Sequence, residues 1–177
     1  MQRKVSLLKL KCNLSLNLDG NGDIKVKTSD KFLDSMLTLM AKEALFDFNL
    51  KAKSASLKDI GTTFGEAIKK AHGNGRSTVM KYTKTIPIKQ DMIICSLELL
   101  SRPFFRFEKE LAGEFKENYD EFFNAFVKSA DAKLHIRIPD SDRKEMFIAV
   151  FSAFGKCLGV ATAHNPVAKY ARNIFQK

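Results

Sequence analysis

Few side chains in this sequence have the types and spacing that catalysis or metal binding requires. The three histidines, His72, His135 and His164, stand alone, and no HxH, HxxxH or HExxH spacing occurs. Without such spacing, each imidazole is interpreted as a surface group or a satisfied core residue. The sequence also lacks a GxSxG motif and a Walker loop, which excludes two common enzyme classes. Spacing alone therefore identifies no active site.

The cysteines also argue against a metal or redox centre. Cys12, Cys95 and Cys157 are odd in number, far apart and without a CxxC pair. This pattern favours buried thiols in a reducing compartment. No apolar run reaches the ~20 residues of a membrane helix, and the start of the chain is unlike a signal peptide. We therefore expect a cytoplasmic protein with no membrane partner.

Positive charge is concentrated in the first half of the chain. The formal net charge is +10; residues 1–90 carry 17 basic and eight acidic side chains, and residues 91–177 carry 13 and 12. Such an excess can bind nucleic acid or another polyanion, or it can be an ordinary solvated surface. The polyanion hypothesis rests on eight lysines: Lys4, Lys9, Lys11, Lys25, Lys27, Lys31, Lys51 and Lys53.

The elements that must position these side chains follow from hydrophobic periodicity. Alternating leucines over 8–18, a Gly-rich turn and residues 23–28 predict a β-hairpin. Gly61 and Gly65 lie four apart in a helical pattern, which indicates close helix packing. Apolar residues at helical spacing predict helices over 32–40, 57–72, 119–130 and 141–158. Further strands are expected over 45–52, 79–86, 92–100, 104–107 and 134–138.

The two halves of this pattern repeat in order and spacing. Each half contains strand, strand, helix, strand and helix, which indicates a duplication of about 90 residues. We therefore predict an α+β fold of two tandem ββαβα repeats, with helices packed between or against two sheets in one pseudo-symmetric unit. The expected boundaries are 1–75 for the first repeat, 76–90 for a connecting strand or loop, 91–162 for the second repeat and 163–177 for a basic tail.

A series of short motifs gives the sequence a family resemblance. In order, they are Asn17-Leu18-Asp19-Gly20, Phe32-Leu33-Asp34-Ser35-Met36-Leu37, Leu45-Phe46-Asp47-Phe48, Asp59-Ile60-Gly61, Ser101-Arg102-Pro103 and Leu134-His135-Ile136-Arg137. Together they resemble the imidazoleglycerol-phosphate dehydratase family over most of the chain. The resemblance implies repeats of the ribosomal protein S5 domain 2-like type. It also implies assembly into large symmetric shells with di-manganese sites between subunits.

The chain departs from this family where the resemblance implies metal ligands. The family's histidines and glutamates align with Ser35, Glu43, Ser54, Ala55, Lys58, Lys144, Glu145 and Ile148, and a further glutamate aligns with Lys9. Manganese needs imidazoles and carboxylates, whereas these positions supply mostly hydroxyl, apolar or cationic groups. Manganese is therefore expected of the family, but its ligands are absent, and we predict no cofactor. Candidate ligand-binding residues that the resemblance retains are Arg102, Arg76 and His135.

These departures lead to one main interpretation and two alternatives. The main interpretation is a catalytically degenerate, metal-free relative that self-assembles, as a trimer or larger shell, and serves as a structural or binding protein. The first alternative is an enzyme, either the histidine-biosynthesis lyase itself or one that acts on another phosphorylated ligand. The second is polyanion or nucleic-acid binding through the basic half. Co-assembly with an active relative also remains open.

Overall fold

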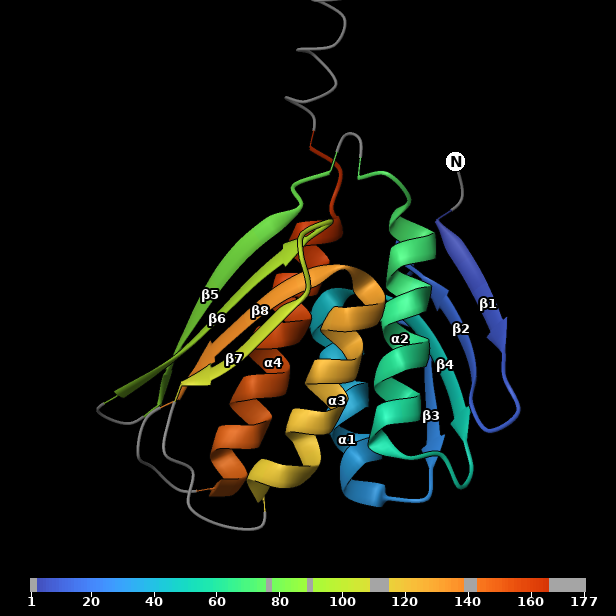
Figure 1. Cartoon of the computed structure of the whole chain (residues 1–177), viewed down its shortest axis with the longest axis horizontal. Coiled ribbons are helices and arrows are strands. Elements are labelled where there is room, and N and C mark those ends of the chain that lie inside the picture. Colours follow the sequence, from blue (N-terminus) through green and yellow to red (C-terminus); the bar gives the residue numbers. More distant parts are fainter. Residues whose placement is uncertain (1–2, 76–77, 89–90, 109–114, 139–142, 166–177) are drawn as a thin grey trace, which may run out of the picture.

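The computed structural model has two sheets that flank a middle layer of helices (Figure 1). It describes residues 3–75, 78–88, 91–108, 115–138 and 143–165; for 91, 115–118 and 143–145 only the backbone is described. None of the helices in these ranges is long and apolar enough to cross a membrane. The predicted basic tail falls almost wholly outside the described residues.

The first half forms a four-stranded sheet in the order β1-β2-β4-β3. Its elements are β1 (Lys4–Leu8), β2 (Asn13–Asn17), β3 (Ile24–Thr28), α1 (Lys31–Ala44), β4 (Asp47–Ala52) and α2 (Leu57–His72). β3 and β4 run parallel, and the other neighbours are antiparallel.

The second half repeats this topology in the order β5-β6-β8-β7, again with one parallel pair, β7 and β8. Its elements are β5 (Lys81–Ile88), β6 (Asp91–Leu99), β7 (Phe104–Glu108), α3 (Phe115–Ala130), β8 (Ala132–Arg137) and α4 (Arg143–Thr162). The predicted α+β fold with two repeated units is confirmed. An additional antiparallel edge strand opens each half, and β5 lies within the range expected to connect them.

The prediction of one strand over 8–18 that pairs with residues 23–28 in a β-hairpin is wrong. β4 lies between β2 and β3 in the sheet. The chain turns between β1 and β2, where the backbone amides of Lys9 and Cys12 each donate to the other residue's carbonyl at 3.2 and 3.3 Å. Leu8 and Leu10 are consequently 85% and 101% exposed. Alternating leucines that run through a tight hairpin keep their period of two, so the pattern alone could not locate the turn.

The helices begin where polar side chains can cap them. Asp30 accepts from the backbone amides of Phe32 and Leu33 at the start of α1. Ser56 and Asp59 form a reciprocal capping box at the start of α2. Such caps satisfy amides that have no partner within the helix. Both starts agree with the predicted ones to within two residues.

The helices of one half pack against those of the other. α2 of the first half contacts α3 of the second, and α4 of the second half contacts α1 of the first. The two contacts are therefore related by an approximate twofold symmetry between the halves. Gly65 on α2 and Gly155 on α4 lie so near a facing backbone carbonyl that a Cβ at either would approach it to under 3.0 Å. Gly61 approaches α3 in the same way, so the predicted close helix packing is confirmed.

The histidine and cysteines of the interior have structural partners. His72 is 6% exposed, and its Nε2 lies 2.8 Å from the Thr78 hydroxyl. Burial lowers the pKa of this imidazole, which favours its neutral form. Cys12, Cys95 and Cys157 are all buried and free. These residues form the satisfied core that the sequence predicted.

Candidate functional site

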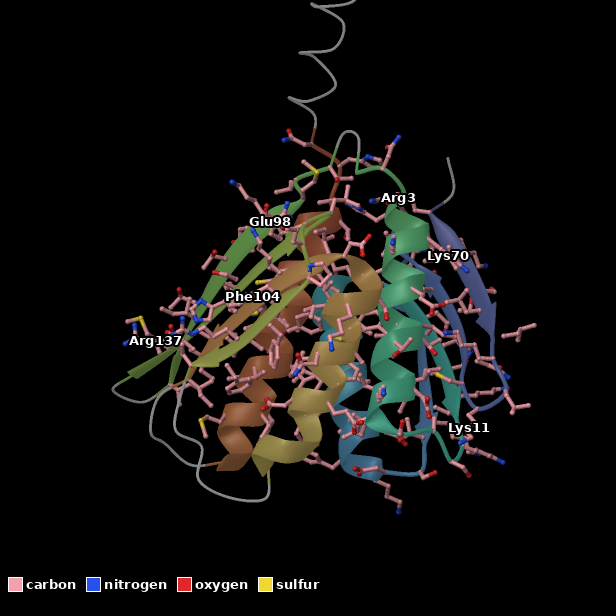
Figure 2. All side chains as sticks on the ribbon, viewed as in Figure 1. Arg3, Lys11, Lys70, Glu98, Phe104 and Arg137 are labelled. Atoms are coloured by element: carbon pink, nitrogen blue, oxygen red, sulfur yellow. The ribbon has the colours of Figure 1, made fainter. Side chains whose placement is uncertain are left out.

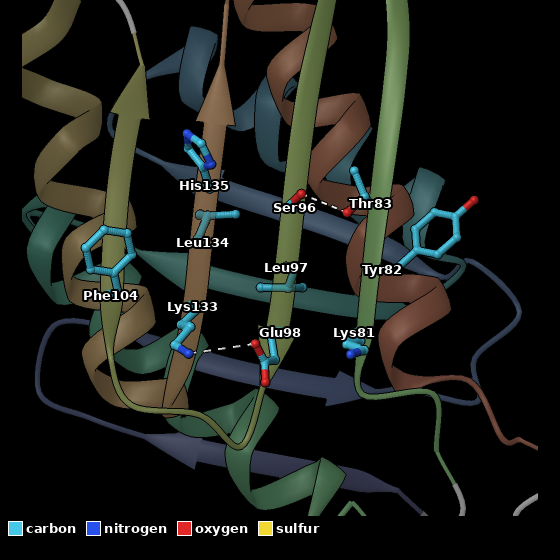
Figure 3. Close-up of a pocket in the computed structure, with 10 residues that line it drawn as sticks. All are labelled: Lys81, Tyr82, Thr83, Ser96, Leu97, Glu98, Phe104, Lys133, Leu134 and His135. Atoms are coloured by element: carbon cyan, nitrogen blue, oxygen red, sulfur yellow. Dashed lines mark hydrogen bonds and ion pairs between the residues drawn. The ribbon is translucent and has the colours of Figure 1, made fainter.

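The outer face of the second sheet carries a hollow of about 650 Å³ in volume (Figure 3). Thr83, Ser96 and His135 occupy neighbouring positions across β5, β6 and β8. Apolar contact area comes from Tyr82 and Phe104, which are 37% and 51% exposed. The sequence predicted neither aromatic residue as part of a site. Only the proximity of Phe104 to the motif Ser101-Arg102-Pro103 could have indicated it. The hollow therefore combines polar groups with exposed aromatic rings, as ligand sites commonly do.

His135 faces a carboxylate beside this hollow. Its Nε2 lies 3.2 Å from Glu108 Oε1, and Arg106 approaches the same oxygen at 3.3 Å. The contact becomes an ion pair when the imidazole is protonated. Glu108 thus lies between the guanidinium of Arg106 and the imidazole of His135.

The structure does not place the other candidate ligand-binding residues, Arg102 and Arg76, in the hollow that His135 lines. Arg102 is exposed in the turn between β6 and β7, two residues before β7 begins, and it does not line the hollow. The turn is fixed by Ser101, whose backbone amide donates to the Asp131 carbonyl at 2.7 Å. Arg76 lies outside the described residues.

The positions aligned with metal ligands are engaged in other contacts. The Ser35 hydroxyl donates to the Lys31 carbonyl at 3.0 Å, within α1. Glu43 accepts from the Ser152 hydroxyl at 3.1 Å and lies 3.5 Å from Lys156, which joins α1 to α4. Ile148 is 48% exposed, and an alkyl group offers no ligand atom. For Lys144 and Glu145 only the backbone is described.

Two further positions lie beside each other in a hollow of about 280 Å³ between the β1–β2 turn and α2. Lys9 and Lys58 line it together with Asp59, and Lys9 forms an ion pair with Glu66 at 2.8 Å. Hydrogen bonds from Ser56 hold the pKa of Asp59 below its usual range, and the nearby charges of Lys11 and Lys58 add to this effect. Ser54 and Ala55 lie in the preceding turn, where the Ser54 amide donates to Ser29 Oγ at 3.3 Å.

This set of side chains does not fit a manganese pair. At the described positions, two lysines, two serines, an alanine and an isoleucine replace the imidazoles and carboxylates that hold such metals, and one carboxylate, Glu43, remains. Among the residues that the structure describes, no three His, Cys, Asp or Glu side chains gather closely enough to hold a metal ion.

Two carboxylates of the family motifs instead hold turns. Asp47 accepts from the backbone amides of Asn21, Gly22 and Asp23, and from the Asn17 amide, at 2.8–3.1 Å. Asp34 accepts from the backbone amide and hydroxyl of Thr28 at 2.8 and 2.6 Å. These aspartates therefore shape the first sheet, which explains why they persist where the metal-ligand pattern does not.

Comparisons with known proteins agree with the resemblance. The family model described as imidazoleglycerol-phosphate dehydratase matches residues 28–158. The protein of that name from Acetivibrio thermocellus is 34% identical over 162 residues, which cover 84% of this chain and 83% of that protein. The one from Clostridium acetobutylicum is 32% identical over 165 residues, 86% of this chain and 84% of that protein.

Solved structures show the same fold. The imidazoleglycerol-phosphate dehydratase of Staphylococcus aureus superposes with a TM-score of 0.83 at 24% identity, over 92% of this chain and 99% of that chain. The Pyrococcus furiosus protein superposes with a TM-score of 0.74 at 20% identity, over 91% and 94%.

Proposed function

Because the chain belongs to the imidazoleglycerol-phosphate dehydratase family, we propose that it is an enzyme of histidine biosynthesis, a lyase that removes water from imidazoleglycerol phosphate. The observation that carries this proposal is the 34% identity to a named dehydratase over 84% of the chain. Relatives of that name cover this chain nearly from end to end, so the likeness extends beyond one repeat.

This proposal corrects the main interpretation drawn from the sequence. A catalytically degenerate structural or binding protein was expected because the metal-ligand positions are replaced. The named relatives at 32–34% identity and the matching structures contradict that interpretation and favour the enzyme. The expectation of a degenerate protein rested on the replaced metal-ligand positions, whereas the likeness to named dehydratases extends over most of the chain.

We place substrate contacts at two of the retained candidates. Arg102 is an exposed guanidinium, a group that binds phosphate through paired hydrogen bonds, and we propose that it contacts the substrate phosphate. His135 lies in the hollow of the second sheet, where an imidazole can accept or donate a proton. Arg76 remains a candidate for the same phosphate from the sequence alone.

The test is turnover of imidazoleglycerol phosphate by the purified full chain, together with growth of a histidine auxotroph that lacks the dehydratase. We expect turnover, a rise of about tenfold or more in KM for Arg102→Ala, and a lower kcat for His135→Gln. Lys128→Ala is the control, because it removes an exposed positive charge on α3 that contacts neither proposed site residue nor Glu108. Absence of both turnover and complementation would refute the proposed function.

We further propose that the reaction does not use a manganese pair, since the described side chains do not fit one. Turnover should then be unchanged after dialysis against a chelator and after addition of manganese. Tight binding of two manganese ions per chain, with turnover lost on their removal, would contradict this.

We also propose that the chain forms a homo-oligomer in the cytoplasm. Leu8 and Leu45 are large apolar side chains that are at least 72% exposed in the single chain, and self-association would cover such groups. Native mass spectrometry of protein from its own cells distinguishes a trimer or larger shell from a monomer. The same spectra report co-assembly with an active relative.

A further inference from the structure

A second lysine-rich hollow lies at one end of the outer face of the first sheet, and we call it the lysine hollow. It has a volume of about 360 Å³. Its lining residues are Leu10, Lys11, Asn13, Lys27, Lys51 and Lys53. Lys11 marks its place beside the β1–β2 turn in Figure 2. Four of its six residues thus carry a positive charge.

Strand register forces two of these charges together. Lys27 on β3 and Lys51 on β4 are direct neighbours in the parallel ladder. Neighbouring strands lie ~4.8 Å apart, and adjacent side chains on one face repel each other when their charges are alike. Lys53 lies in the turn directly after β4, and its side chain lines the same hollow. The folded chain holds this repulsion in place.

In the described residues, no carboxylate forms an ion pair that would offset the repulsion between these lysines. Within the described part of the chain, no ion pair or hydrogen bond engages the ammonium groups of Lys11, Lys27, Lys51 or Lys53. Two other lysines from the predicted basic face do have partners: Lys9 pairs with Glu66 at 2.8 Å and Lys25 pairs with Asp23 at 3.3 Å. The structure thus narrows a diffuse basic surface to one cluster.

The cluster continues into the neighbouring hollow between the β1–β2 turn and α2. Leu10 and Lys11 line both hollows, and Lys58 adds one more ammonium group. Asp59 is the nearest carboxylate, but its oxygens are engaged in the capping box with Ser56. A ligand in the lysine hollow would therefore meet an excess of at least four positive charges.

We propose that the lysine hollow binds a small anion that carries two or more phosphate groups. Lysine binds phosphate as a compact point charge, and several ammonium groups around one small depression favour a compact ligand of high charge density. A single phosphate would leave most of the repulsion uncompensated, whereas pyrophosphate or tripolyphosphate carries enough negative charge to offset several of the ammonium groups that line the hollow. The inference is independent of the dehydratase reaction, whose substrate carries one phosphate.

Isothermal titration of the full chain with sodium tripolyphosphate, pyrophosphate and orthophosphate tests this. We expect affinity to increase in the order orthophosphate, pyrophosphate, tripolyphosphate, and to fall by about tenfold or more between about 20 and 200 mM NaCl because the charges are solvent-exposed. The triple variant K27Q/K51Q/K53Q should lose tripolyphosphate binding by about a hundredfold.

The matched control is K42Q/K70Q/K128Q, which removes three charges from exposed lysines on the helices. The net charge changes equally in both variants. The control should nevertheless keep nearly the full affinity for tripolyphosphate, because its three lysines do not line the hollow. The lysine-hollow variant should also keep or raise its melting temperature, since like charges are removed, so a folding defect is distinguishable from loss of the site.

Three results would overturn the proposal: equal affinity for orthophosphate and tripolyphosphate, equal loss in both triple variants, or tight binding of single-stranded RNA that tripolyphosphate does not displace. The last would make nucleic acid the occupant. The dehydratase assay, run on the same preparations, shows separately whether the proposed function holds.

Discussion

The two halves of the molecule share strand order, register and parallel pair, yet their outer faces differ in charge. On the first sheet, Lys27 and Lys51 lie side by side, and neither forms an ion pair with any of the residues that the structure describes. On the second sheet, Lys133 lies 3.9 Å from Glu98 on the next strand, and Arg106 and His135 share Glu108. Basic side chains of the second sheet thus lie beside carboxylates, whereas Lys27 and Lys51 of the first sheet lie beside each other.

This difference arises because the two faces of each sheet are under different constraints. Inward residues of β4 and β8 are buried and apolar in both halves, because they pack against helices in one common core. Outward residues meet only solvent in the single chain, so the halves are free to differ there. A duplicated fold can thus keep its stability in the interior and carry separate binding properties on its two outer faces.

The strongest test of the shared core compares Phe64 with Phe154, which occupy equivalent places on α2 and α4. Both are at most 1% exposed, and both pack on Phe126, with ring centroids 5.2 and 5.1 Å away. Truncation to alanine should cost about 3–5 kcal/mol at either site. Urea unfolding at neutral pH measures the loss.

Because the two rings meet on one partner, the double variant should be non-additive. Phe104→Ala is the control, since its half-exposed ring should cost less than about 1 kcal/mol. Two separate unfolding transitions in either variant would contradict a single core shared by both halves.

A second test addresses the helix contacts that join the halves. Gly65→Ala and Gly155→Ala each push a methyl group into a facing carbonyl, so each should lose about 1–3 kcal/mol through overpacking. Lys70→Ala, at an exposed position on α2, should change stability by less than about 0.5 kcal/mol. Markedly unequal losses at the two glycines would show that the halves are not packed equivalently.

The patterns that the sequence predicted well are those that packing dictates. Buried positions such as Phe122 and Phe126, the helix over 57–72 and the duplication all follow from periodicity. The turn after Leu8 was missed because the leucine alternation continues through it. The lysine cluster was only partly foreseen, because the register that places Lys27 beside Lys51 is set by long-range strand pairing. The main interpretation of the function was wrong because it followed the replaced ligand positions in preference to a family resemblance that covers most of the chain.

A third test uses pH to compare Asp47 with its counterpart Lys133. Hydrogen bonds from the Asp23 backbone, with those from Asn17 and Asn21, hold the pKa of Asp47 below its ordinary value of 3.8. Its ionised form therefore stabilises the fold above pH 3.8, and this stabilisation is lost as the pH falls through the folded-state pKa. Asp47→Asn should cost about 1–2 kcal/mol at pH 7, and much less near pH 2.

Lys133→Gln breaks only the half-exposed pair with Glu98, so it should cost less than about 0.5 kcal/mol at pH 7. Urea unfolding of both variants at neutral and acidic pH measures the contrast. A pH-independent loss in Asp47→Asn would mean that the charge of the carboxylate does not stabilise the turn.

The smallest expected effect concerns the residues that end the first helix of each half. Leu45 and Asp131 both adopt positive φ, at 58° and 51°. A left-handed backbone is costly for a leucine, and Leu45 is 72% exposed, so its side chain gains little from packing. Leu45→Gly should therefore stabilise the protein by about 0.5–1 kcal/mol. Asp131→Gly should gain less, because aspartate tolerates this conformation better and its ion pair with Lys69 at 2.6 Å is lost. The melting temperatures of both variants test this. An equal rise at the two sites would contradict the prediction, because it would mean that neither the tolerance of aspartate for positive φ nor its ion pair with Lys69 matters.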